Sequence, residues 1–212
     1  MRRNALPRWW VSLLPSLVAL VVALLVGAGL MLLAGSNPLH AYQALLSGAF
    51  GSWYSLSEVA VKACPLLLTG LAVTIAFQAG VWNIGVEGQL LMGALVMTVL
   101  GSQVTAVPAI VGLPLYLSAA AGAGALWAGI AGVLKTTRHV NEILSTIMLN
   151  FIALHLLGYL VHGPLMEVSG QYPQTDPIAA HLLLPRLMPP YRLHIGLCLA
   201  VLMALVLHFG LY

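Results

Sequence analysis

Long stretches without a charged side chain constrain this fold more than any other feature of the sequence. No Asp, Glu, Lys or Arg occurs in residues 9–57, 88–134 or 193–212. A charge at the centre of a bilayer costs at least about 2.5 kcal/mol, so each stretch has room for one or more spans of about 20 residues. Only 6% of the residues are charged and 61% are hydrophobic, whereas about a quarter of a soluble domain is charged. We therefore predict an all-α, polytopic transmembrane helix bundle.

The apolar runs predict about six spans within one membrane domain that covers residues 1–212. The first run, residues 11–33, is about 34 Å long as a helix. It has more residues than the apolar region of a signal peptide, which has about 7 to 15. The uncharged stretch 37–57 mixes polar and aromatic side chains, which favours an interfacial or re-entrant segment. The expected spans are residues 11–33, 58–77, 84–100, 107–134, 143–162 and 193–212.

Basic residues predict the orientation of these spans. Three arginines precede the first span, and Lys135 and Arg138 lie in the short loop before the fifth. The positive-inside rule places both groups in the cytoplasm, and the proline-rich connection 163–191 outside the cell. The last span would then run inward and end without a polar tail. From this ending we expect a chain that lacks the C-terminal part of a longer protein.

Several classes of function are disfavoured by what the sequence lacks. Its basic residues form no stripe that could follow a nucleic acid, and Cys64 and Cys198 lie in apolar stretches, so we expect neither a disulfide nor a metal site. The segment 132–136 lacks the glycine that precedes the lysine of a phosphate loop, and protease signatures are missing. We expect no enzyme activity and no cofactor, and any ATP hydrolysis would belong to another subunit.

The densest group of polar side chains lies between two apolar spans. Asn83, Glu87 and Gln89 bring a carboxylate and two amides to a depth where such groups must face protein, water or substrate. The alternative is a local structural role for these residues, and it is compatible with side chains that face protein, water or substrate. In it, Asn83 caps the third span, and Glu87 lies in an early turn that the helix dipole favours.

A second polar group opens the fifth span. Glu142, Thr146 and Asn150 recur every four residues, so they share one face of a helix. Such a stripe forms either the wall of a pathway or a seam of hydrogen bonds between helices. In the fourth span, small residues recur on two faces, which indicates close helix packing. These faces comprise Ala121, Ala125 and Gly129, and Gly124, Ala128 and Gly132.

Three ordered motifs resemble one known family. The segments PLLLTGLAV (residues 65–73), NIGVEGQL (83–90) and NEILSTIMLN (141–150) are similar to those of permease subunits of bacterial ABC importers for nucleosides and simple sugars. These subunits belong to a superfamily with the branched-chain amino acid and ribose permeases. The similarity extends over nearly the whole chain. The sequence departs from the pattern of this family at two places. Relatives often have a basic residue where this chain has Gln78. They also continue beyond the equivalent of Tyr212 into a loop that engages the ATPase.

The resemblance implies a multi-pass subunit in the bacterial cell membrane that forms the pathway for nucleosides or related small solutes. Its implied partners are two cytoplasmic ATP-binding subunits, a second permease subunit, an external solute-binding lipoprotein and the lipid bilayer. Candidates for the pathway or its gate are Asn83, Glu87, Gln89, Glu142, Thr146 and Asn150.

The alternative is an ion- or proton-coupled secondary transporter, a class to which the shared helix face of His155 and His162 could point. We favour the other explanation of that pair, in which both histidines are hydrogen-bonded within the protein or lie at the membrane interface. Such a transporter would need ligands for the coupling ion, such as paired intramembrane carboxylates, and the spans offer chiefly Glu87 and Glu142.

Overall fold

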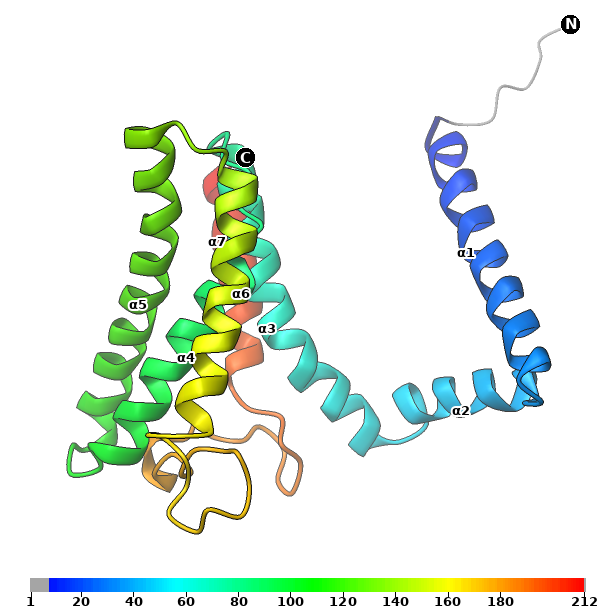
Figure 1. The fold of residues 1–212 in the computed structure, drawn as a ribbon. Helices are drawn as coiled ribbons and strands as arrows, with labels where there is room; N and C mark the ends of the chain where they lie inside the picture. Colours follow the sequence, from blue (N-terminus) through cyan, green and yellow to red (C-terminus); the bar gives the residue numbers. More distant parts are fainter. Residues whose placement is uncertain (1–7, 212) are drawn as a thin grey trace, which may run out of the picture. The chain divides into compact units, whose positions relative to one another are not determined.

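The computed structural model describes residues 8–211, and within them seven α-helices and no β-strand (Figure 1). The helices are α1 (Arg8–Leu33), α2 (Pro38–Phe50), α3 (Trp53–Gln78), α4 (Val86–Gln103), α5 (Ala109–Arg138), α6 (Glu142–Val161) and α7 (Gly196–Leu211). A short 3-10 helix, η1 (Ala180–Leu182), lies in the long connection before α7. The predicted all-α class is confirmed. Arg2 and Arg3, on which the predicted orientation partly rests, lie outside the described residues.

Four of these helices are long and apolar enough to cross a membrane: α1 from Leu13 onward, α3, α5 and α6. Together with the composition they identify a multi-pass membrane protein. The 18 residues of α4 and the 16 of α7 extend about 27 and 24 Å, so the count of six spans and the orientation stay predictions. The predicted bounds differ by a few residues, most at α3, which begins at Trp53, five residues before the expected start.

The chain divides into two compact units within α3, at residue 59. In the first unit, Asn37 caps α2 by accepting the N–H of Leu39 at 3.0 Å, and Pro38 occupies the first turn. The hydroxyl of Tyr42 donates to the Leu24 carbonyl at 2.6 Å and so links α2 to α1. Most of the stretch 37–57, expected to be interfacial or re-entrant, is therefore a separate helix followed by the start of α3.

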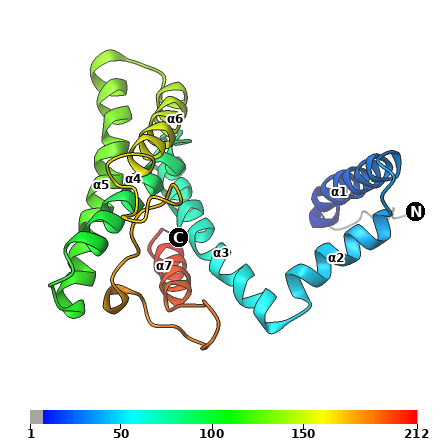
Figure 2. The same ribbon diagram turned by 60° about the horizontal axis from the view of Figure 1, so that its bottom comes forward.

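The centre of the second unit is formed by α4, α5 and α6, which pack side by side (Figure 2). Small residues permit this approach. A Cβ atom at Gly93 would lie 3.0 Å from the Ala120 carbonyl oxygen, and one at Gly124 would lie 3.1 Å from that of Gln89. Of the two predicted small-residue faces, the one with Gly124 contacts α4. The other, with Ala121, Ala125 and Gly129, is exposed.

The two ends of this unit differ in their chemistry. The α5–α6 turn, with Lys135 and Arg138 nearby, lies at one end, and the connection 162–195 lies at the other (Figure 1). That connection is tied to the helices by the N–H of Ala179, which donates to the Gly101 carbonyl at 2.9 Å. Within it, hydrogen bonds from Ser169 and Gln174 hold the pKa of Glu167 below its usual range.

Substitutions at two glycines of α5 test the packing of α4 on α5. Leucine at Gly124 would place its Cβ against the Gln89 carbonyl, whereas a Cβ at Gly129 meets nothing within 4 Å. Both changes raise helix propensity by up to about 1 kcal/mol, so the difference between them isolates the contact. We expect Gly124→Leu to lower the midpoint of thermal unfolding in detergent, and Gly129→Leu to leave it unchanged or raise it. Equal midpoints for the two variants would contradict this packing.

Candidate functional site

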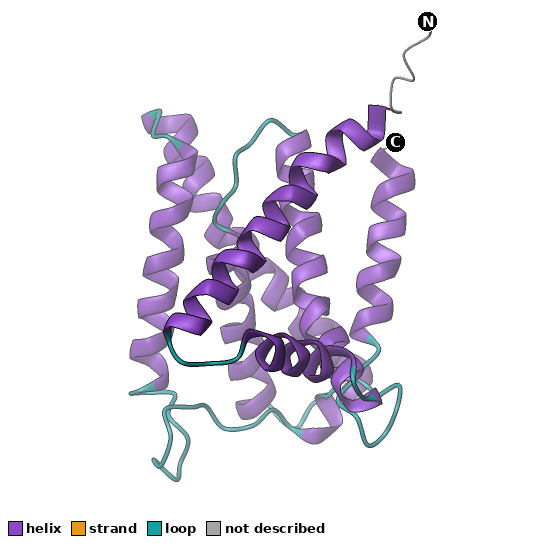
Figure 3. Ribbon diagram, turned by 90° about the vertical axis from the view of Figure 1, so that its right-hand side faces the viewer, coloured by secondary structure: helices purple, strands orange, loops and turns teal. Residues whose placement is uncertain are grey.

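The site begins where α3 ends and the chain turns back into the bundle. Gly80 has a φ of 73°, a left-handed conformation that glycine adopts without strain. The N–H of Val81 donates to the Ala76 carbonyl and that of Gly80 to Phe77, so the end of α3 is closed by hydrogen bonds. An irregular stretch then descends to the start of α4 at Val86 (Figure 3). The third predicted span therefore begins as a loop at its first two residues.

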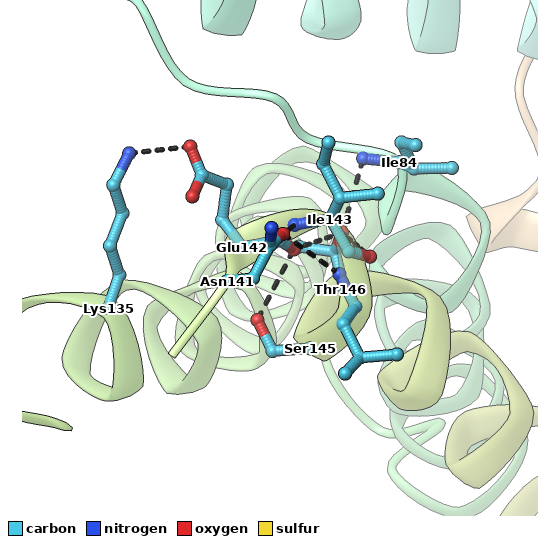
Figure 4. A network of polar contacts seen from close by, with 8 residues as sticks. Ile84, Lys135, Asn141, Glu142, Ile143, Ser145 and Thr146 are labelled. Carbon is cyan, nitrogen blue, oxygen red and sulfur yellow. Dashed lines mark hydrogen bonds and ion pairs between the residues drawn. The ribbon is translucent and has the colours of Figure 1, made fainter. Parts of the chain in front are cut away.

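Side chains of α6 supply the hydrogen bonds that this irregular stretch needs. The Asn150 side-chain oxygen accepts the N–H of Gly88 at 2.8 Å, and its amide nitrogen donates to the Ile84 carbonyl at 2.9 Å. The buried Thr146 hydroxyl accepts the Ile84 N–H at 3.4 Å (Figure 4). Backbone groups away from water need such partners, and the first N–H groups of a helix have none within it. Thr146 and Asn150 thus form a hydrogen-bond seam.

The side chains of Asn83 and Gln89 pair with each other across the start of α4. The Gln89 amide nitrogen donates to Asn83 at 3.0 Å, and the Asn83 amide nitrogen donates to Gln89 at 3.3 Å. The Asn83 oxygen also accepts the N–H of Gly85 at 2.9 Å. Gly85 holds the N-cap position of α4, so the expectation that Asn83 caps this helix was wrong. Asn83 instead folds the loop just before it.

The α5–α6 turn brings a lysine and a glutamate together. His139 ends α5 in a left-handed conformation, and the Asn141 side chain caps α6 by accepting the Ile143 N–H at 2.8 Å. This tight turn lets the Lys135 ammonium contact the Glu142 carboxylate at 2.7 Å (Figure 4). The side chains are 38% and 19% exposed. A pair that is partly exposed to solvent adds little to the stability of a fold, so its chief effect is to cancel two charges.

A cavity of about 460 Å³ lies among α3, α4, α5 and α6, within the size range of small-molecule sites. Its lining residues are Ala76, Val81, Asn83, Gln89, Ala128, Ala131, Gly132, Lys135, Thr136, Glu142 and Thr146. Four of the six predicted site residues therefore meet here: Asn83, Gln89, Glu142 and Thr146. Small alanines and a glycine form much of the remaining wall. The cavity thus combines amide, hydroxyl and paired charged groups with little steric bulk.

Two predicted residues lie elsewhere, and two lining residues were missed. Asn150 does not line the cavity, and its side chain instead forms hydrogen bonds with the backbone of Gly88 and Ile84 beside it. Glu87 lies in the first turn of α4, as expected, but its side chain is exposed and does not line the cavity. Lys135 was interpreted as a topology signal, and apart from that both residues were considered only within the rejected phosphate loop, residues 132–136. A short turn that separates Lys135 from Glu142 by seven residues was the available signal for their pairing.

Loss of the Asn150 side chain tests the seam. Asn150→Ala would leave one N–H and one carbonyl unpaired at the start of α4, and each buried unpaired group costs about 1–3 kcal/mol. We expect a clearly lower midpoint of thermal unfolding in detergent. Ser118→Ala is the matched control, since Ser118 is exposed and its hydroxyl bonds only within α5, to the Pro114 carbonyl. A shift for Asn150→Ala as small as the control's would refute the seam.

Comparisons with known proteins find relatives that match most of this chain. The chain is 38% identical over 200 residues to the guanosine ABC transporter permease protein NupP of Bacillus subtilis, covering 93% of this chain and 57% of the relative. It is 40% identical over 185 residues to the glucose ABC transporter permease protein TsgB13 of Haloferax volcanii, covering 87% and 48%. It is 30% identical over 204 residues to the nucleoside ABC transporter permease protein NupB of Lactococcus lactis, covering 92% and 56%.

The chain thus spans about half the length of the curated relatives that it matches. No solved structure matches it. The sequence model of one family, described as the permease component of the branched-chain amino acid transport system, matches residues 55–212. This match covers α3 to α7 almost completely, including every residue that lines the cavity. The chain therefore belongs to the family of branched-chain amino acid transport system permease components.

Proposed function

We propose that this chain is a membrane-spanning permease subunit of an ATP-binding-cassette importer, and that the cavity among α3, α4, α5 and α6 is part of the pathway for a neutral solute. The solute class that we propose is nucleosides or simple sugars, in keeping with the names of the relatives. Family membership and the apolar helices support the permease role. In this proposal ATP is hydrolysed by two separate cytoplasmic subunits. A second permease subunit and an external solute-binding lipoprotein complete the importer in the bacterial cell membrane.

The chemistry of the cavity wall carries the proposal. Asn83 and Gln89 contribute amide groups that bond to each other. Thr146 contributes a hydroxyl that bonds to the backbone at Glu142 and Ile84, and much of the remaining wall is small and apolar. Lys135 and Glu142 are the charged residues of the wall, and they cancel each other at 2.7 Å. An electrically neutral wall with hydrogen-bonding groups suits a solute with hydroxyl and amide groups, because such a solute needs no counter-charge. A solute of net charge would have to break the ion pair or stay unneutralised.

The contacts around the cavity also suggest how it opens. The loop before α4 is held to α6 by single hydrogen bonds from Thr146 and Asn150, and the Lys135–Glu142 pair bridges α5 and α6. A small displacement of α6 relative to α4 and α5 would break these contacts together. We assign that displacement to the ATP-driven step, with the cavity end in the cytoplasm and residues 163–191 outside. Glu87, exposed on α4, is placed to face the pathway or the second permease subunit in the assembled importer.

A secondary transporter is less well supported by these contacts. Coupling to an ion or proton needs free carboxylates near the solute. Glu142 is paired with Lys135, and Glu87 lies outside the cavity.

Uptake measurements with charge variants test the proposal. The system is a proteoliposome with this chain and the ATPase, permease and binding protein encoded beside it, supplied with radiolabelled guanosine, glucose or leucine. We expect Lys135→Gln to reduce uptake of the neutral solute strongly, since it leaves the Glu142 charge unpaired. The double variant Lys135→Gln with Glu142→Gln should recover part of it because neutrality returns.

A variant at Gln89 tests the amide groups of the cavity wall in the same uptake assay. Gln89→Ala should weaken apparent affinity by up to about tenfold, as loss of one hydrogen bond predicts, whereas Ser118→Ala should leave uptake unchanged. Equal loss of uptake in the single and double charge variants, or no effect of Gln89→Ala, would contradict a neutral solute pathway here. Uptake that persists without the ATPase would favour the secondary transporter.

A further inference from the structure

A second cavity, of about 480 Å³, lies at the opposite end of the same unit. Arg186, Arg192 and His194 form one side of it. The other side is apolar and includes Met97 of α4 together with Leu113 and Leu117 of α5, and a leucine-rich segment, residues 182–184, completes it. Its lining residues include none of the five acidic side chains of the chain. This cavity therefore combines a cationic rim with an apolar wall.

Backbone hydrogen bonds hold the cationic rim in place. Arg186 and His194 face each other in an isolated antiparallel bridge. The N–H of Leu187 donates to the Leu193 carbonyl at 2.8 Å, and that of Ile195 donates to Pro185 at 3.1 Å. The two arms of residues 185–195 thus lie side by side and bring the basic residues to one edge of the cavity.

The hydrogen bond to the His194 ring determines which of its two nitrogens can donate to a ligand. Its Nδ1 accepts the N–H of Gly196 at 3.1 Å. A neutral imidazole that accepts at one nitrogen carries its hydrogen on the other. The Nε2–H is therefore a donor, and it adds to the guanidinium groups a third group suited to an anionic oxygen.

The apolar wall extends well below the rim. Leu113 and Leu117 lie four and eight residues after the start of α5 at Ala109, which places them about 6 and 12 Å along the helix. Leu182, only 1% exposed, packs against Gly112 and keeps this wall rigid. A small soluble anion would leave that wall unused, and an acidic protein surface would not reach it. A molecule with an anionic head and a hydrocarbon chain fits both parts.

We propose that this cavity binds an anionic phospholipid of the surrounding bilayer. Its phosphate lies between Arg186 and Arg192, near the Nε2–H of His194, and one acyl chain lies over Met97, Leu113 and Leu117. Arginine suits this role because its planar donors match phosphate oxygens in pairs. Basic pockets between membrane helices on the cytoplasmic or matrix side hold anionic lipid head groups, and we extend the same chemistry to this cavity at the other end of the unit. The site lies at the end of the unit opposite the cavity among α3, α4, α5 and α6, so it stands independently of the solute pathway.

Lipid binding by the purified full chain tests the proposal. Native mass spectrometry would measure the affinity for dioleoyl phosphatidylglycerol and dioleoyl phosphatidylcholine, with glycerol 3-phosphate as a head group without chains. We expect phosphatidylglycerol to bind at least about tenfold more tightly than phosphatidylcholine, since each arginine near an anionic head contributes roughly a fivefold factor. Glycerol 3-phosphate should fail to compete at equal concentration.

Three variants separate the parts of the site. Arg186→Gln with Arg192→Gln should abolish the preference for phosphatidylglycerol, whereas Arg138→Gln, an exposed arginine at the other end, should preserve it. Leu117→Trp leaves the basic residues in place and puts a larger side chain into the space beside the apolar wall. Because this space would hold the acyl chain, the variant should weaken binding of both lipids. Circular dichroism and thermal unfolding without added lipid confirm that each variant is folded.

Four results would overturn the site. They are equal binding of the two lipids, an Arg138→Gln effect as large as that of the double variant, competition by glycerol 3-phosphate, and unchanged lipid preference in the double variant. Competition by glycerol 3-phosphate would indicate a simple anion site. Unchanged lipid preference in the double variant, with lost binding of an acidic solute-binding protein, would assign the rim to protein docking.

Discussion

The cavity depends on how the start of α4 is hydrogen-bonded inside an apolar bundle. A helix that begins there exposes N–H groups that neither water nor lipid can satisfy, and an irregular loop before it adds more unpaired groups. Asn150 pairs with both the Gly88 N–H and the Ile84 carbonyl, and Thr146 accepts the Ile84 N–H. Two side chains of α6 thereby make a non-helical segment tolerable at this depth.

The same arrangement accounts for the shape and the chemistry of the site. Because the chain descends as a loop before α4 forms, a space remains beside the end of α3, and the alanines and glycine of α5 leave it unfilled. Asn83 and Gln89 are turned towards each other at its edge. The Lys135–Glu142 pair then removes net charge from its wall. Polar and neutral character thus arise from one loop, one helix face and one tight turn.

Local patterns predicted much of this, and contacts distant in sequence set the rest. Charge-free runs located the helices, and the four-residue spacing of Glu142, Thr146 and Asn150 located their shared face. The spacing could not identify the partner of that face, because Asn150 and Ile84 are 66 residues apart. The alternative in which Asn83 caps the third span was wrong, because the helix begins at Val86 and Gly85 holds its N-cap position. Exposure of Glu87 depends on packing that no local pattern encodes, whereas the short turn between Lys135 and Glu142 was an available signal for their pairing.

A disulfide between the loop and α6 tests the central claim most directly. A Cβ atom at Gly85 would lie 3.0 Å from the Thr146 Cβ, about 0.8 Å short of the mean separation in a disulfide, so the loop must shift slightly for the bond to form. In a background with Cys64 and Cys198 replaced by alanine, Gly85→Cys with Thr146→Cys should cross-link rapidly in membranes under mild oxidant. Gly129→Cys with Thr146→Cys is the control pair and should stay reduced. Absence of the first cross-link, or equal cross-linking of both pairs, would contradict the account.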